Sequence, residues 1–264
     1  MEKYAPIGVL DSGVGGLTVL THLRQLMPHE NFIFVGDTAR TPYGDRPEAE
    51  IRVFVEELIS WLEKQGVKMI VIACNTLTNL GVNTLKKDHK CLIIGMSRAE
   101  QLLLAASRNK KIGVMATQFT INTEANKKAV LALDNTVEVY PMPCPKFVPL
   151  IEGEKFGTPE LDAAVREYAA PLRQAGIDAL ILACTHYPFL QQQIAYELGY
   201  SVKIVDPAED AAMVAKKVLE VLDILNTEGE GKTTICCTKD KERVARLASR
   251  IMPADNLEFR EIKL

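Results

Sequence analysis

Two segments of this chain, 110 residues apart, resemble each other closely. Residues 66–76 (GVKMIVIACNT) and 176–186 (GIDALILACTH) both run from a glycine through an apolar strand to an Ala-Cys pair and a polar residue. Buried strands in any protein are rich in Ile, Val, Leu and Ala, but burial does not demand the shared Ala-Cys. A second match pairs residues 7–12 with residues 112–117 in the same order. We therefore predict two related half-domains.

Short apolar runs alternate with segments of helical period along most of the chain. Runs such as residues 69–73 are apolar throughout, which is typical of strands in a parallel sheet covered by helices on both faces. The predicted fold class is α/β, with two pseudo-symmetric, doubly wound parallel-sheet domains. Strands are expected at residues 7–10, 32–35, 68–73, 91–95, 111–115, 136–140, 178–183 and 202–205, with a last strand at 233–237.

The boundaries of the two domains follow from the crossings between the halves, which we expect at residues 95–99 and around Asp206 to Ala208. The first domain would comprise residues 1–97 and 209–264, and the second residues 98–208. Ligands of doubly wound sheets bind outside the C-terminal ends of the strands. The active site is therefore expected in the cleft between the domains.

Composition narrows the class of partner. The net charge is −3 and Lys and Arg are not clustered, so the sequence does not indicate a positively charged surface for nucleic acid or an anionic membrane. We therefore expect a small-molecule substrate. The sequence has no signal-peptide pattern and no run of about 18 apolar residues, which predicts a cytoplasmic protein. Six cysteines are then expected as free thiols, and the scattered histidines predict no metal site.

Two of these cysteines could carry chemistry. Cys74 and Cys184 each end a strand and begin a polar loop that leads toward a helix, where backbone N–H groups favour a thiolate. Either one alone could be a buried structural thiol. As a pair they suit inversion of an α carbon, which needs a base on one face and an acid on the other. The loops at Ser12–Gly13, Tyr43–Gly44, Asn75–Thr76 and Thr185–His186 could supply donors for a substrate carboxylate.

A glycine-rich turn at residues 11–16 (DSGVGG), with Asp37 after the next strand, resembles part of a dinucleotide-binding motif. The motif requires a third glycine where this chain has Thr18, which argues against a nicotinamide cofactor. A turn whose backbone N–H groups meet a carboxylate fits the sequence as well.

Two further polar residues, His186 and Asp11, keep two interpretations each, and a third, Glu152, keeps none. His186, two residues after Cys184, could assist that thiol or be structural. Asp11 could support Cys74 or cap the following helix. Glu152 has no role that the sequence alone assigns.

Taken together, five segments resemble bacterial glutamate racemases, and the resemblance covers most of the chain. They are residues 11–19 (DSGVGGLTV), 36–44 (GDTARTPYG), 73–76 (ACNT), 144–149 (CPKFVP) and 183–188 (ACTHYP). The resemblance implies the aspartate/glutamate racemase fold, no pyridoxal phosphate or other cofactor, a homodimer, and supply of D-glutamate for peptidoglycan.

The resemblance also implies roles for individual residues. Cys74 would act on the D enantiomer with support from Asp11, and Cys184 on the L enantiomer with support from Glu152 and His186. The implied substrate contacts are Asp11, Ser12, Pro42, Tyr43, Gly44, Asn75, Thr76, Thr117, Thr185 and His186.

The sequence departs from the family pattern at Arg98 within residues 96–99, at Gln118 within residues 116–119, and at Asn126. These departures bear on substrate preference and rate more than on reaction type. The family's N-terminal extension that accompanies activation by a cell-wall precursor is not seen here, so no such activation is expected.

Three alternatives stay open at this point. The chain could be an aspartate or broad-specificity racemase with the same thiols, or a non-catalytic binding homologue, although a binder has no need of two thiols. A third hypothesis makes Cys184 and His186 the nucleophile and base of a hydrolase. It leaves Cys74 unexplained.

Overall fold

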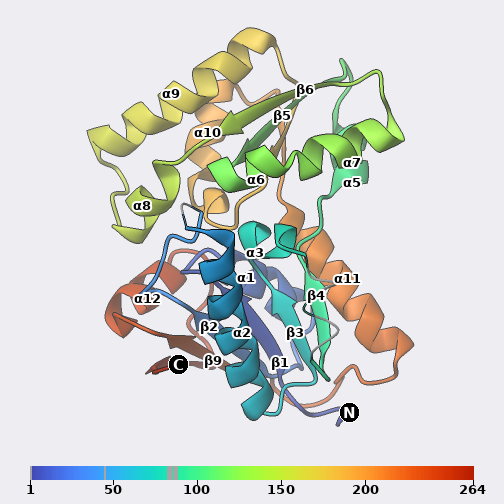
Figure 1. Cartoon of the computed structure of the whole chain (residues 1–264), viewed down its shortest axis with the longest axis vertical. Coiled ribbons are helices and arrows are strands. Elements are labelled where there is room, and N and C mark those ends of the chain that lie inside the picture. The colour runs from blue at the N-terminus through green and yellow to red at the C-terminus, as the bar shows by residue number, and fades with distance from the viewer. Residues whose placement is uncertain (1, 45, 82–84, 86–88) are drawn as a thin grey trace. The chain divides into compact units, whose positions relative to one another are not determined.

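The computed structural model of the chain describes residues 2–44, 46–81, 85 and 89–264. The chain divides into two compact units, one made of Met1–Met96 and Ala208–Leu264 and the other of Ser97–Pro207 (Figure 1). Each unit contains one sheet, and every strand pairing in the described residues is parallel. The predicted α/β class, with two doubly wound parallel sheets, is confirmed.

The first unit holds a six-stranded sheet in the order β10-β9-β2-β1-β3-β4. Strands β9 and β10, the last strands of the chain, continue this sheet beyond β2, and Figure 1 labels β9 beside β2. Its elements are β1 (Ile7–Asp11), α1 (Leu17–Leu26), β2 (Phe32–Gly36), α2 (Glu48–Lys64), β3 (Met69–Ile72), α3 (Asn75–Asn79), β4 (Leu92–Gly95), α11 (Pro207–Val221), β9 (Thr233–Cys237), α12 (Lys241–Ala248) and β10 (Leu257–Glu261).

The second unit holds a four-stranded sheet in the order β6-β5-β7-β8. Its elements are α5 (Glu100–Ala106), β5 (Lys111–Ala116), α6 (Gln118–Thr123), α7 (Ala125–Leu133), β6 (Glu138–Pro143), α8 (Phe147–Glu152), α9 (Pro159–Ala175), β7 (Ala179–Leu182), the 3₁₀ helix η1 (Tyr187–Leu190), α10 (Gln191–Leu198) and β8 (Lys203–Val205).

The internal sequence match is a structural repeat. The order β2-β1-β3-β4 in the first unit corresponds to β6-β5-β7-β8 in the second. The backbone N–H of Ala73 donates to the carbonyl of Leu10 at 2.8 Å, and that of Ala183 donates to the carbonyl of Met115 at 2.8 Å. These four residues stand at equivalent places in the two matched pairs of segments. The strand that ends in Ala-Cys therefore has the same register against its central neighbour in both units.

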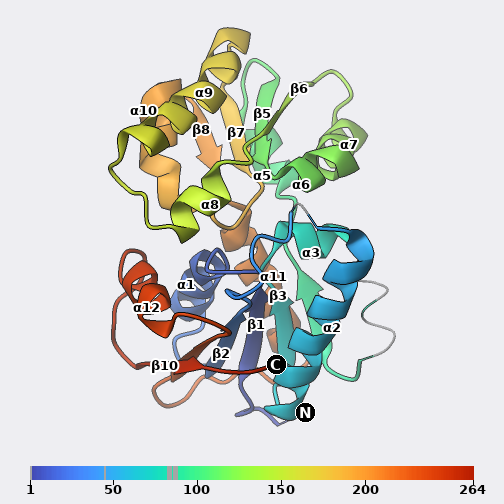
Figure 2. The same cartoon turned by 60° about the vertical axis from the view of Figure 1, so that its left-hand side comes forward.

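Strand β7 shows why both faces of these sheets are apolar. Leu180, Leu182 and Cys184 pack into a core with residues of α8, α9 and α10. The alternate residues Ala179 and Ile181 pack into a second core with α5 and α7. Figures 1 and 2 show these two groups of helices on opposite sides of the four-stranded sheet. A continuous apolar strand is the result of burial on both faces.

Two strands differ from the sequence prediction. Strand β6 runs from Glu138 to Pro143 instead of residues 136–140 and contains Pro141. Prolines are tolerated there because β6 is an edge strand that pairs only with β5. Strand β10 was not predicted, because its sequence LEFRE has no continuous apolar run and lies largely exposed at the other sheet's edge. None of the helices in the described residues is long and apolar enough to cross a membrane.

The end of β2 lies against the loop that follows β1. A Cβ atom added at Gly36 would lie 2.3 Å from the carbonyl oxygen of Gly13, which is a backbone atom and cannot move aside as a side chain can. We expect Gly36→Ala to lower the free energy of unfolding by about 2 kcal/mol, measured by urea denaturation. Gly8→Ala is the matched control, because its Cβ would meet only side-chain methyl groups, at 3.1 Å or more. Equal stability of the two variants would contradict this close approach.

Candidate active site

The first unit brings Asp11, Ser12 and Cys74 to one edge of its sheet. Asp11 is the last residue of β1, and Cys74 lies two residues beyond the end of the adjacent strand β3, at the N-cap of α3. Ser12 Oγ and Cys74 Sγ share a hydrogen bond of 3.8 Å. The Asp11 carboxylate is fully buried and accepts a hydrogen bond of 2.7 Å from the backbone N–H of Gly13. A thiol, a hydroxyl and a carboxylate thus gather where two parallel strands end.

The next two residues add polar groups beside this thiol. Asn75 and Thr76 form the first turn of α3, and both side chains are buried. Within the part of the chain that the structure describes, Asn75 Nδ2 has no hydrogen-bond partner. A buried donor without a partner costs free energy, so this amide is suited to a substrate acceptor.

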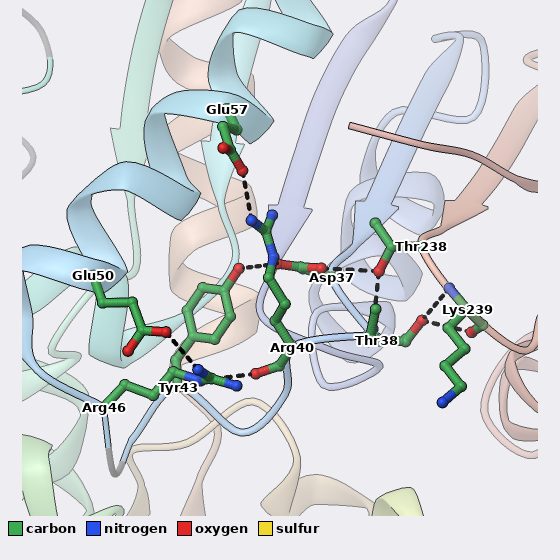
Figure 3. Close-up of polar contacts among 10 residues, drawn as sticks. Asp37, Thr38, Arg40, Tyr43, Arg46, Glu50, Glu57, Thr238 and Lys239 are labelled. Atoms are coloured by element: carbon green, nitrogen blue, oxygen red, sulfur yellow. Dashed lines mark hydrogen bonds and ion pairs between the residues drawn. The ribbon is translucent and has the colours of Figure 1, made fainter.

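The segment 37–44 carries the other predicted contacts of this unit (Figure 3). The Tyr43 side chain is 1% exposed, packs on Phe54 with ring centroids 5.3 Å apart, and donates its hydroxyl proton to the carboxylate of Asp37. Burial and the adjacent Asp37 carboxylate raise the pKa of Tyr43 well above its usual range. The phenol is therefore engaged inside the unit.

The second unit brings Cys184, His186 and Glu152 together. Cys184 follows β7 by two residues, and His186 is the N-cap of η1. His186 Nε2 lies 2.9 Å from Glu152 Oε1, and the same imidazole is hydrogen-bonded to the Cys184 side chain. All three side chains are buried. Sequence analysis could not assign Glu152, because only the packing of α8 places it beside a residue 34 positions away.

Helix α8, which carries Glu152, is anchored by aromatic contacts. The ring of Phe147 packs edge-on against Tyr168 of α9 and Tyr187 of η1, each at 5.1 Å between ring centroids. The Tyr187 hydroxyl donates a hydrogen bond of 3.0 Å to the carbonyl of Cys144, just before the helix. The carboxylate is therefore held on a rigid support.

The electrostatics of this group favour a cationic imidazole. Burial by itself lowers the pKa of His186, but the hydrogen bonds to Cys184 and Glu152 outweigh it and hold the pKa well above its ordinary value. In contrast, burial raises the pKa of the neighbouring Cys144 thiol far above its usual range. Of the two thiols in this region, Cys184 is the one that is hydrogen-bonded to the His186 imidazole.

Thr117 and Thr185 complete the predicted residues of this unit. Thr117 follows β5 as the N-cap of α6, and Thr185 is buried between Cys184 and His186. The three departures from the family pattern differ among themselves. Arg98 and Gln118 are exposed, whereas Asn126 is buried at the wall of a cavity of about 110 Å³.

Sequence reasoning missed one buried residue near these groups. Asp37 drew attention only as part of an incomplete dinucleotide motif, yet its carboxylate is fully buried and fully engaged with side chains of its own unit. The signal that could have found it is the polar Asp-Thr pair directly after an apolar strand. Among the described residues, no group of three or more His, Cys, Asp or Glu side chains could hold a metal ion.

Each of the two repeated units thus carries a thiol at the same backbone position, two residues beyond its strand. Comparison with protein families agrees with this geometry. The chain belongs to the Asp/Glu/hydantoin racemase family, whose model matches residues 17–215.

Individual relatives place the chain more closely within the family. It is 40% identical over 247 residues to a glutamate racemase of Microcystis aeruginosa, an alignment that covers 94% of this chain and 87% of that protein. Among solved structures, a glutamate racemase isoform from Bacillus anthracis matches with a TM-score of 0.91 and 32% identity, covering 100% of this chain and 99% of the other. The glutamate racemase of Francisella tularensis, solved in complex with D-glutamate, matches with a TM-score of 0.85 and 30% identity, covering 99% and 98%. The resemblance found in the sequence is confirmed.

The ion pair of Glu152 and His186 predicts a pH-dependent contribution to stability. A histidine whose pKa is raised on folding stabilises the protein below the unfolded pKa of about 6.5, and this contribution is lost as the pH rises through the folded pKa. We expect Glu152→Gln to lower the pKa of His186, measured by NMR titration. Its cost in stability should be about 2 kcal/mol below pH 6.5 and should shrink as the pH rises.

The control for this variant is Glu160→Gln, the same change at an exposed position in the first turn of α9. It should leave the titration of His186 unchanged, and any loss of helix stability at this position should not depend on the protonation of His186. A His186 pKa that is the same in wild type and Glu152→Gln would contradict the ion pair.

Proposed function

We propose that this protein is a cofactor-independent glutamate racemase in which Cys74 and Cys184 act on opposite faces of the substrate α carbon. The observation that carries the proposal is the pair of buried thiols, each two residues beyond a strand that has the same register in both units. Glutamate is the proposed substrate because relatives 40% identical over 94% of this chain are named glutamate racemases.

The proposed reaction is a proton transfer on each side of the α carbon. With L-glutamate, the Cys184 thiolate removes the α proton, and the electron pair of the broken C–H bond is delocalised into the carboxylate group. The Cys74 thiol then donates its proton to the opposite face, which gives D-glutamate and leaves a Cys74 thiolate. D-glutamate reacts in the reverse sense, with Cys74 as the base. Protons balance between the two thiols, so the reaction needs no oxidant, reductant or cofactor.

The partners of each thiol suit these steps. His186 is the proposed partner of Cys184, and although burial lowers the pKa of this imidazole, its hydrogen bonds to Cys184 and Glu152 raise it. Asp11 and Ser12 are the corresponding partners of Cys74, with Ser12 in direct contact with its sulfur. The two half-sites thus use different groups for the same task.

The proposed substrate contacts are polar groups of the loops that follow the strands. Asn75 Nδ2, the buried donor described above, is suited to a carboxylate oxygen. The complete set is Asp11, Ser12, Pro42, Tyr43, Gly44, Asn75 and Thr76 from the first unit, and Thr117, Thr185 and His186 from the second.

The proposal extends to the metabolic role, the cellular compartment and the oligomeric state of the protein. D-glutamate from this reaction would supply peptidoglycan synthesis in the cytoplasm, where the six free cysteines would stay reduced. The protein is further proposed to form a homodimer, which light scattering coupled to size-exclusion chromatography measures directly.

The test uses circular dichroism to follow L- and D-glutamate with purified protein and no added cofactor. Wild type should bring both enantiomers to the racemic mixture. Cys74→Ala and Cys184→Ala should each lower kcat/KM by at least about 10²-fold, the usual scale of general acid–base catalysis. Because the equilibrium constant between enantiomers is one, the loss in each variant must be equal in both directions. The control is Cys91→Ala, whose half-buried thiol has a pKa raised to about 12 by burial and by Glu63.

Other outcomes would contradict specific parts of the proposal. Full activity in either active-site variant would contradict the two-thiol mechanism. Faster turnover of aspartate than of glutamate would replace the proposed substrate. Activity that appears only after addition of pyridoxal phosphate would contradict cofactor independence, and no turnover of either amino acid would favour a binding protein.

A further inference from the structure

Asp37 lies at the centre of a buried polar network in the first unit (Figure 3). Its carboxylate accepts hydrogen bonds from the Tyr43 hydroxyl, from Arg40 Nε at 2.5 Å and from Thr238 Oγ1 at 2.8 Å. Its backbone N–H donates to the carbonyl of Asp11 at 3.1 Å. The residue is 0% exposed, so it cannot touch a ligand. Its three side-chain donors also leave it unsuited to the ribose of a dinucleotide.

The network closes the segment 37–44 into a compact loop. The backbone N–H groups of Arg40 and Thr41 both donate to the carbonyl of Asp37, each at 3.1 Å. The Arg40 guanidinium also lies 4.0 Å from the centre of the Phe54 ring, which packs on Tyr43. One carboxylate therefore fixes both ends of the loop that carries the proposed contacts Pro42, Tyr43 and Gly44.

The C-terminal part of the chain forms the other side of the network. The hydroxyl of Thr238 accepts from the backbone N–H of Ala39 at 2.9 Å while it donates to Asp37. The hydroxyl of Thr38 donates to the carbonyl of Lys239 at 2.6 Å and accepts from the N–H of the same residue at 2.9 Å. These contacts attach the end of β9 to the loop across about 200 residues of sequence.

We infer that Asp37 and Thr238 are positioning residues for substrate binding, acting through the anchored phenol of Tyr43 on the backbone of the loop 37–44. A buried carboxylate bound by three donors is costly to disturb. Arg40 and Tyr43 donate from the loop itself, and Thr238 donates from the segment after β9. The Tyr43 side chain then serves as the anchor, and the backbone of Tyr43 and Gly44 as the part that meets the substrate. This inference rests on the proposed function for its substrate and on the contacts above for its geometry.

The test variant is Asp37→Asn, which keeps the shape and replaces one acceptor oxygen by a donor. We expect the KM for glutamate to rise on the order of tenfold while kcat falls by less than about threefold. The reason is that the loop 37–44 contributes to substrate binding, whereas the two thiols carry out the proton transfers. Thr238→Val, which removes one hydroxyl at the rim of the network, should raise KM by about threefold. Glu48→Gln is the matched control, since the same change at an exposed ion pair with Arg52 should leave both constants unchanged.

Hydrogen exchange gives a readout that does not depend on turnover. Backbone amides of Ala39, Arg40 and Thr41 should exchange on the order of tenfold faster in Asp37→Asn, because their acceptors belong to the network. A double variant with Tyr43→Phe should raise KM no further than Asp37→Asn alone, since both changes break the same contact.

Unchanged KM in Asp37→Asn, with only a lower melting temperature, would overturn the inference and leave Asp37 a purely structural residue. Equal exchange rates in wild type and variant would overturn the anchoring itself. If wild type fails to racemise glutamate, the proposed function fails; faster exchange in Asp37→Asn would then still support the anchored loop, and unchanged exchange would reject it.

Discussion

The pairing of each Ala-Cys strand with a central parallel neighbour is the constraint on which the rest of the structure depends. Strand β3 pairs with β1 and β7 with β5 in equivalent registers, so the carboxyl ends of both strands in each pair reach the same edge. The residues of β3 and β7 are buried and apolar. Polar side chains that could contact a ligand therefore begin with the residues just after each strand. Cys74 and Cys184 occupy that place: Cys74 is the N-cap of α3, and Cys184 lies two residues before His186, the N-cap of η1.

The two units share this strand framework but carry different side chains at equivalent positions after the strands. Asp37 and Cys144 occupy equivalent positions, since the N–H of each donates to the residue that ends the central strand, Asp11 or Ala116. In the first unit this position holds a carboxylate that organises a loop. In the second it holds a protonated thiol, and the helix after it presents Glu152 to His186. The repeat therefore supplies matched thiols, while the loops supply unlike partners.

Much of this fold could be predicted from the sequence, because continuous apolar strands and the repeated Ala-Cys are local patterns. Strand β10 escaped prediction because an exposed edge strand has no apolar run, and β6 was misplaced because its prolines look like strand breakers. The roles of Glu152 and Asp37 depend on contacts that only packing creates, with partners 34 and as many as 201 positions away. Sequence motifs marked the residues that end strands, but could not show which distant side chains meet them.

The most direct test of the two-thiol account is early-time racemisation of L-glutamate in D₂O, with isotope content measured separately in each enantiomer. If one thiol removes the α proton and the other protonates the opposite face, newly formed D-glutamate carries deuterium, while recovered L-glutamate still carries hydrogen. A single base that both removes and returns the proton would transfer hydrogen into the product or deuterate both enantiomers together. Either of these patterns would contradict the account.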